Sequence, residues 1–142
     1  MASAAQLLSR KPNELHSVGP DAAVLEAIQL MAEHGVGALL VMQGDKLAGI
    51  ITERDYARKV ILKGRSSADT SVRDIMTANV HTVEPGLSAQ QCMQIMTERR
   101  VRHLPVVEAG RVIGMLSIGD LVRAVLAEQA QTIEQLENYI HH

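Results

Sequence analysis

The chain has 142 residues, of which 46% are hydrophobic, and its formal net charge is −2. These totals predict a single compact unit with enough apolar side chains to bury a core. Because the chain has no Phe or Trp and only two tyrosines, it lacks an aromatic platform on which nucleic-acid bases stack, which argues against nucleic acid as the main partner. No apolar run approaches the roughly 18 residues of a membrane span, so no membrane association is expected.

The cysteine content and the N-terminal segment indicate the compartment. Cys92 is the sole cysteine, so no intramolecular disulfide can form, and its apolar neighbours predict a buried thiol. Residues 1–12 lack a long hydrophobic region and are not a secretory signal peptide. We therefore predict a cytoplasmic location. An organelle presequence, suggested by Ser3, Ser9 and Arg10 and by the lack of acidic residues beside them, is the less favoured alternative.

The sequence repeats itself with a shift of 65 residues, without a gap, from residues 18–60 to residues 83–125. Twelve positions are identical across this shift, among them Gly49 and Gly114. The chain is therefore predicted to hold two copies of one motif, at residues 18–65 and 83–127. An N-terminal lead-in (1–17), a linker and lead-in strand (66–82) and a C-terminal helix extension (128–142) complete it.

Hydrophobic periodicity changes in the same order within each copy. A short strand at Val18 or Val83 precedes an amphipathic helix, at residues 24–31 or 87–96. Two strands joined by a turn follow, at residues 38–42 and 47–52 in the first copy and at residues 104–107 and 112–117 in the second. A further helix, at residues 55–62 or 120–127, closes each copy. The pattern predicts an α/β (α+β) fold of two β-α-β-β-α motifs packed sheet to sheet about a pseudo-twofold axis.

Both copies carry the same signature on the turn from their last strand into their last helix. It is Gly49-Ile50-Ile51-Thr52-Glu53-Arg54-Asp55 in the first copy and Gly114-Met115-Leu116-Ser117-Ile118-Gly119-Asp120 in the second. A Ser or Thr followed three residues later by an acid is a capping arrangement for a helix N-terminus. The same geometry suits a ribose 5′-phosphate, because free helix amides and a hydroxyl hold phosphate while the aspartate accepts hydrogen bonds from vicinal hydroxyls. Both interpretations stay open.

The complete pattern resembles the CBS domain over residues 18–126. It consists of V-x-P, a helix ending in M-x-E, then V-x-x-L-x-V and the signature, and the tandem pair resembles a Bateman module. Such pairs form disc-like modules that bind AMP, ADP, ATP, NAD or S-adenosylmethionine between the copies. The resemblance implies that Asp55 and Asp120 contact ribose hydroxyls and that Thr52 and Ser117 contact phosphate.

The resemblance also implies that the adenine lies on main chain of the opposite copy. This pairs Asp55 and Thr52 with Thr77, Val80, His81, Arg102, His103 and Leu104, and it pairs Asp120 and Ser117 with Lys11, His16, Val36, Gly37 and Ala38. Because Arg102 and His103 stand where the first copy has Gly37 and Ala38, we expect unequal occupancy of the two sites. Residues 74–77 (D-I-M-T) have no counterpart at residues 9–12, the positions reached by the shift of 65.

Arg54 belongs to a basic cluster that follows the first signature. Its other members are Arg58, Lys59, Lys63 and Arg65. A solvated helix face is the favoured interpretation of such a charge run, and contact with further phosphates or with the second half of a dinucleotide is the alternative. Pro105, which cannot donate a ladder hydrogen bond, predicts an edge position or one beside the cleft opening for its strand.

The sequence beyond the second copy contains an apolar stripe. Its members, at alternating steps of four and three, are Val122, Leu126, Gln129, Ile133, Leu136 and Ile140. We expect this helix to pack in a homodimer, with folding back on its own domain as the alternative.

Taken together, the sequence predicts a regulatory sensor that binds an adenosyl nucleotide and signals to an unidentified effector protein. AMP or ATP is favoured over NAD, and S-adenosylmethionine is the least favoured ligand. No enzymatic activity is expected, because the chain has no P-loop, no G-x-G-x-x-G and no G-x-S-x-G motif. No metal site is expected, because no Cys/His cluster at ligand spacing is present. The alternative is a structural homodimerisation module whose signatures only cap helices.

Overall fold

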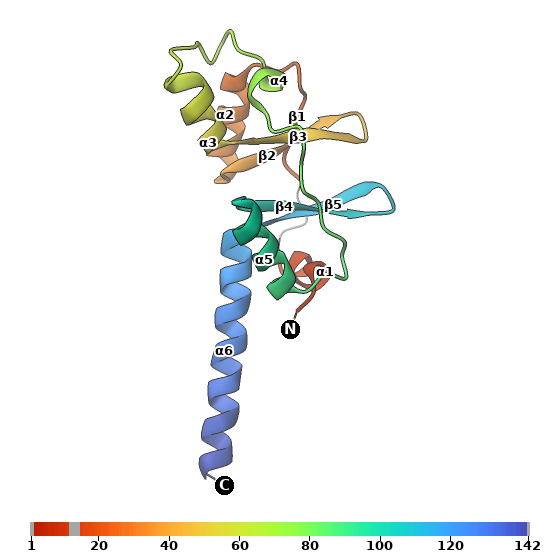
Figure 1. Cartoon of the computed structure of the whole chain (residues 1–142), viewed down its shortest axis with the longest axis vertical. Coiled ribbons are helices and arrows are strands. Elements are labelled where there is room, and N and C mark those ends of the chain that lie inside the picture. Colours follow the sequence, from red (N-terminus) through yellow and green to blue (C-terminus); the bar gives the residue numbers. More distant parts are fainter. Residues whose placement is uncertain (1, 12–14, 142) are drawn as a thin grey trace. The chain divides into compact units, whose positions relative to one another are not determined.

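The computed structural model of the chain describes residues 2–11 and 15–141, and its elements are drawn in Figure 1. The chain divides into two compact units. The first-copy unit is Glu14–His81, and the second-copy unit combines Met1–Asn13 with Thr82–His142. The single unit expected from the composition is thus divided, because each copy of the repeat builds a core of its own. Met1 and residues 12–14 of the predicted lead-in, and His142 of the predicted extension, lie outside the described residues.

The first-copy unit has the predicted order of strand, helix, strand, strand and helix, followed by one further helix that was not predicted. Its elements are β1 (Ser17–Val18), α2 (Val24–His34), β2 (Ala38–Gln43), β3 (Lys46–Thr52), α3 (Glu53–Tyr56), the π-helical turn η1 (Ala57–Ile61) and α4 (Val72–Ile75). The sheet order is β1-β2-β3, with β1 parallel to β2 and β2 antiparallel to β3. The predicted last helix begins at Glu53, two residues earlier than expected and directly after its N-cap Thr52.

The second-copy unit repeats this plan with a smaller sheet. Its elements are α1 (Ala4–Ser9), α5 (Ala89–Arg99), β4 (His103–Glu108), β5 (Arg111–Ser117) and α6 (Ile118–His141). β4 and β5 form an antiparallel pair, while Val83 makes a single parallel bridge to Val106 instead of the expected strand. The Val83 amide donates to the Pro105 carbonyl oxygen at 3.0 Å. β4 therefore lies between β5 and the Val83 bridge rather than at an edge, and Pro105 faces the side where pairing is limited to that bridge.

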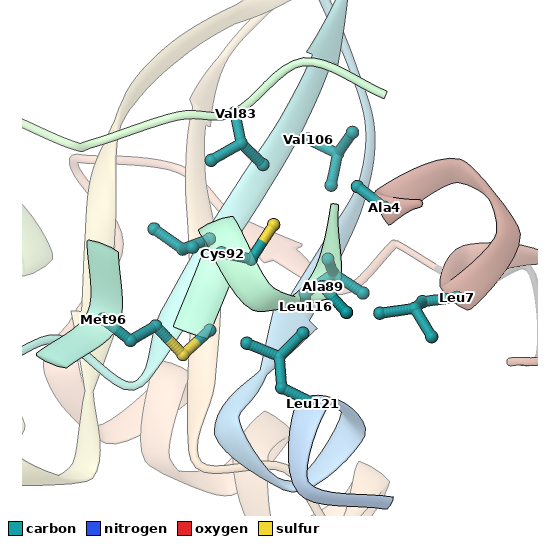
Figure 2. Close-up of a cluster of buried hydrophobic side chains, with 10 residues drawn as sticks. Ala4, Leu7, Val83, Ala89, Cys92, Met96, Val106, Leu116 and Leu121 are labelled. Carbon is teal, nitrogen blue, oxygen red and sulfur yellow. The ribbon is translucent and has the colours of Figure 1, made fainter. Parts of the chain in front are cut away.

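The core of the second-copy unit gathers side chains from segments far apart in the sequence. Figure 2 shows Leu7 of α1 directed toward Leu116 of β5 and Leu121 of α6, with Cys92 of α5 in the same cluster. Cys92, Leu116 and Leu121 have no exposed surface, and Leu7 is 3% exposed. The predicted burial of Cys92 is confirmed. Burial also raises the pKa of its thiol.

The segment that precedes each motif packs on the other motif. Ser3, the N-cap of α1, bridges to Ser88, and Ser71, the N-cap of α4, bridges to Ala23. Ala23 and Ser88 are 65 residues apart, whereas Ser3 and Ser71 are 68 apart. Residues 74–77 therefore correspond to residues 6–9. The comparison with residues 9–12 was wrong, because the lead-ins lie outside the register of the repeat.

The two lead-in helices were not predicted from the sequence. Residues 66–82, expected as a linker and lead-in strand, contain α4 followed by an isolated bridge between Thr77 and Ile50. α1 has a complete capping box, in which Ser3 and Gln6 each accept from the other's amide. The two helices bury equivalent apolar positions, since Leu7 in α1 and Ile75 in α4 are 68 residues apart and both are buried.

α6 combines two segments that were predicted as separate elements. The last helix of the second copy and the C-terminal extension form one continuous helix of 24 residues. No helix in the described part of the chain combines the length and apolar composition needed to cross a membrane.

Candidate functional site

The two signature turns have the same hydrogen-bond geometry. The Asp55 amide donates to Thr52 Oγ1 at 3.1 Å, and the Thr52 amide donates to Asp55 Oδ2 at 3.0 Å. In the second copy, the Asp120 amide donates to Ser117 Oγ at 3.3 Å and the Ser117 amide donates to Asp120 Oδ2 at 2.8 Å. Each hydroxyl also donates to the same carboxylate oxygen, at 3.0 Å. The capping interpretation is therefore confirmed in both copies.

The helix amides next to these caps are largely occupied. The Glu53 amide donates to the Gly37 carbonyl oxygen at 3.0 Å, and the equivalent Ile118 amide donates to the Arg102 carbonyl oxygen at 2.9 Å. With the aspartate amide bound to the hydroxyl, the first and third amides of each helix already have acceptors. The expectation of free helix amides is therefore wrong at the first and third positions of each helix.

Each strand start lies beside the signature of its own copy. Ala38 pairs with Thr52 across β2 and β3, and His103 pairs with Ser117 across β4 and β5. Thr77 exchanges two backbone hydrogen bonds with Ile50, two residues before Thr52. The resemblance implied instead that each strand start is paired with the signature of the opposite copy. Those pairings join two separate units and stay predictions.

Lys11 reaches the second signature from the N-terminal segment, as the sequence predicted. Its Nζ lies 2.8 Å from Asp120 Oδ2 and 2.9 Å from the Met115 carbonyl oxygen. Arg123 binds the other carboxylate oxygen, Oδ1, at 2.7 Å. The Asp120 side chain is 7% exposed. Four hydrogen bonds from three residues thus converge on one nearly buried carboxylate.

These contacts determine the charge states of the second site. Burial pushes the pKa of Asp120 upward, but hydrogen bonds from Lys11 and Ser117 outweigh it and hold the pKa below its ordinary value. Burial lowers the pKa of His103, and the positive charges of Lys11 and Arg102 lower it further against the opposing effect of Asp120. His103 is therefore neutral at pH 7, while Asp120 is ionised.

Asp55 in the first copy is less engaged than Asp120. Apart from Thr52, its partner is Lys59, whose Nζ lies 3.2 Å from Asp55 Oδ1 and also donates to the Ile75 carbonyl oxygen at 2.8 Å. A carboxylate offers about four lone-pair positions, so Asp55 retains acceptor capacity on Oδ1. The two sites are therefore unequal, and the Asp55 carboxylate is more available to a ligand than the Asp120 carboxylate.

The remaining predicted site residues differ in how far they are exposed and in what they contact. Arg54 and Arg102 are exposed, and Val80 and His81 are half-buried in the segment after Thr77. His16 belongs to the first-copy unit, where its ring stacks on His34 with centroids 3.9 Å apart. Its predicted approach to Asp120 stays a prediction.

Lys59 and Arg123 are the site residues whose contacts the sequence did not predict. Lys59 was assigned to a basic helix face, and Arg123 was noted as an identical position of the repeat. Their spacing could have predicted these contacts, because a cation three or four residues after an acid lies on the same side of a helix. No group of three or more His, Cys, Asp or Glu side chains suited to a metal ion occurs in the part of the chain described by the structure.

Asp120→Asn is expected to destabilise the protein at pH 7 by about 1 to 2 kcal/mol, because asparagine carries no charge to hold Lys11 and Arg123. The folded-state pKa of Asp120 is depressed. Its stabilising effect is therefore present above the unfolded-state pKa of about 3.9 and is lost as the pH falls through the lower folded-state value. Urea unfolding from pH 7 to pH 3 should show the difference between variant and wild type shrinking below about pH 4.

Asp45→Asn, at an exposed turn position, is the matched control and should leave stability unchanged across this range. A difference for Asp120→Asn that stays constant down to pH 3 would contradict the role of the ionised carboxylate.

Comparison with known proteins gives one consistent family. The family model described as CBS domain matches residues 5–62 and 72–127. A CBS-domain protein structure from Burkholderia ambifaria MC40-6 is 54% identical, with a TM-score of 0.87 over 90% of this chain and 96% of that chain. The CBS domain-containing protein CBSX3, mitochondrial, of Arabidopsis thaliana is 49% identical over 84% of this chain, which spans 61% of that protein.

A more distant structure contains bound ligands. The CBS domain pair of protein MJ0100, in complex with 5′-methylthioadenosine and S-adenosyl-L-methionine, is 25% identical. Its TM-score is 0.80, and the match covers 90% of this chain and 98% of that one.

Proposed function

Because the chain belongs to the CBS-domain family, with both of its motifs matched, we propose that it binds an adenosine-containing ligand and signals the bound state to a partner protein. A CBS pair is a regulatory module, and this chain is proposed to have no catalytic activity of its own. The two copies are proposed to pack sheet to sheet about a pseudo-twofold axis, with the ligand between them. A ligand can shift such an arrangement only to the extent that it binds one state better than another.

The observation that carries this proposal is the repeated pairing of a hydroxyl with an aspartate. In both units the Ser or Thr that ends a strand holds the aspartate carboxylate within 3.0 Å. An ionised, oriented carboxylate is a strong acceptor for the two vicinal hydroxyls of a ribose. The adenosine compounds bound by the MJ0100 pair support the same ligand class.

The less engaged carboxylate of Asp55 supports the first signature as the preferred site. The Asp120 carboxylate is already bound by Ser117, Lys11 and Arg123, whereas the Asp55 carboxylate is bound by Thr52 and Lys59 alone among the described residues and keeps one more acceptor position. The neighbouring Arg54 is exposed and carries a positive charge suited to phosphate. AMP or ATP is therefore the proposed ligand, ahead of NAD, and S-adenosylmethionine is the ligand class of the MJ0100 relative.

A second candidate function rests on the capping geometry itself. Since the signature residues complete each helix cap among themselves, the alternative function is a structural homodimerisation module. The cytoplasmic location stays a prediction. The mitochondrial location in the name of the Arabidopsis relative supports the organelle alternative.

Calorimetric titration of the full chain with AMP, ATP, NAD and S-adenosylmethionine tests the proposal. We expect saturable binding of at least one compound without turnover, and a 2′-deoxynucleotide should bind roughly ten-fold or more weaker, because one hydrogen bond to a charged acceptor is lost. Equal affinities for ribo and deoxy forms would overturn the ribose contact. If none of the four compounds binds, the homodimerisation module becomes the function.

A further inference from the structure

α6 carries a surface that its own unit does not cover. By helical rise the 24-residue helix is about 36 Å long. Its first turns pack on α1, α5 and β5, and Leu121 there is fully buried. From residue 129 to residue 140 every residue is exposed, and Figure 1 shows the helix running away from the remainder of its unit. The predicted alternative, folding back on its own domain, is thus wrong for the described residues.

The exposed length carries the apolar stripe predicted from the sequence. The exposed fractions along it are 43% for Val122, 58% for Leu126, 57% for Ile133, 57% for Leu136 and 76% for Ile140. Tyr139 beside it is 83% exposed. A continuous stripe of this kind on a helix is stabilised when it is buried against another apolar surface.

We propose that α6 pairs antiparallel with α6 of a second copy of this chain, about a twofold axis that passes beside Gln131. The stripe is symmetric about this point. Val122 and Ile140 both lie nine residues from Gln131, Leu126 and Leu136 lie five, and Gln129 and Ile133 lie two. In the antiparallel register each residue of the stripe meets its mirror position on the partner, so four of the six layers are wholly apolar.

The charges beside the stripe favour the antiparallel direction over the parallel one. Arg123 and Glu137 directly follow Val122 and Leu136, the stripe residues that precede a step of four, and they are two heptads apart, so they lie on the same flank. In a twofold antiparallel pair this flank faces itself, and Arg123 comes within two residues, about 3 Å along the axis, of Glu137 of the partner subunit. Two symmetric ion pairs result.

A parallel pair would leave the same charges without partners. There the flank of Arg123 and Glu137 would face the opposite flank of the second helix. The residues of that flank, each directly before a stripe position that is reached by a step of four, are Val125, Thr132 and Tyr139, none of them charged. Arg123 is 73% exposed although it binds Asp120. Its guanidinium has five donors, so it can bind both carboxylates.

Sedimentation equilibrium of the full chain tests the charge pattern. We expect a dimer whose Kd rises about five- to thirty-fold in Glu137→Lys, which converts two attractions into repulsions. Adding Arg123→Glu to that variant should restore much of the affinity. Glu134→Lys makes the same charge change away from the seam and should leave the Kd unchanged. A monomer at all concentrations, or equal effects of the two lysine variants, would overturn the proposal.

Disulfide trapping tests the direction of the helices independently of the charges. Ala130 lies one residue from the centre, on the flank of Arg123, and in the antiparallel pair it faces Ala130 of the partner subunit. Ala130→Cys should therefore form a covalent dimer on mild oxidation, whereas Leu136→Cys should not, because the two copies of that residue are about 15 Å apart along the axis. The opposite result would show a parallel pair. Cys92 is buried and does not compete.

Discussion

Asp55→Ala is expected to weaken binding of an adenosine-containing ligand by roughly ten- to a hundred-fold. The carboxylate would accept hydrogen bonds from the ribose, and each such bond to a charged group is worth about 1.5 to 3 kcal/mol. The substitution also removes one side of the helix cap, in which the Thr52 amide donates to Asp55 Oδ2. A stability loss of about 1 kcal/mol is therefore expected in parallel.

Calorimetry and urea unfolding of the same samples separate the two effects. Asp45→Ala removes an exposed aspartate from the β2–β3 turn of the same unit and should change neither quantity. If Asp55→Ala binds the ligand as tightly as the wild type, the first signature is only a helix cap. If the variant is unfolded, Asp55→Asn, which retains an acceptor for the Thr52 amide, provides the comparison.

Gly49→Ala is expected to destabilise the protein by about 2 to 3 kcal/mol. A Cβ at Gly49 would lie 2.6 Å from the Thr77 carbonyl oxygen and 3.0 Å from Met76 Sδ. That carbonyl is held in place, because it accepts from the Ile50 amide at 3.0 Å while the Thr77 amide donates back to Ile50 at 2.9 Å. The methyl group fits only if the bridge between β3 and the lead-in segment opens.

Gly114→Ala makes the same change at the equivalent position of the repeat. Its Cβ would meet the Leu8 side chain, with Cδ2 at 2.5 Å. Leu8 can adopt another rotamer, so a smaller loss of about 1 kcal/mol is expected. Gly19→Ala is the control, because nothing lies within 4 Å of the Cβ position at Gly19. The losses are measured by urea unfolding. A loss of stability in Gly114→Ala that equals or exceeds the loss in Gly49→Ala would contradict the distinction between backbone and side-chain neighbours.

Periodicity and repetition predicted the elements of each motif. A shift of 65 residues aligns the strands, the first helices and the signatures, and the structure confirms their order in both copies. The resemblance to CBS domains, which those residues carried, is confirmed by the family match over both motifs. The aspartates and hydroxyls of the signatures lie together as expected, because Ser or Thr at a helix N-cap must approach the third helical residue.

The lead-in segments could not be predicted in the same way. Their equivalence has a shift of 68, and α1 and α4 share almost no residue types, so a single register misses it. Nor could the sequence show that each lead-in packs on the other copy, because either copy offers an equivalent apolar surface. The contact of Lys11 with Asp120, 109 residues apart in the chain, follows from this exchange.

The exchange of lead-ins also determines the order in which the two units can form. The first-copy unit is one continuous stretch, Glu14–His81, whereas the second-copy unit requires both ends of the chain. During synthesis Leu7 and Leu8 emerge before the first-copy unit, but their partners on β5 and α6 emerge after it. The first-copy unit can therefore fold on the ribosome while the apolar side chains of α1 are still unpacked. Completion of the second core depends on closing a long loop, so it should be the slower event and the stage most open to capture by chaperones.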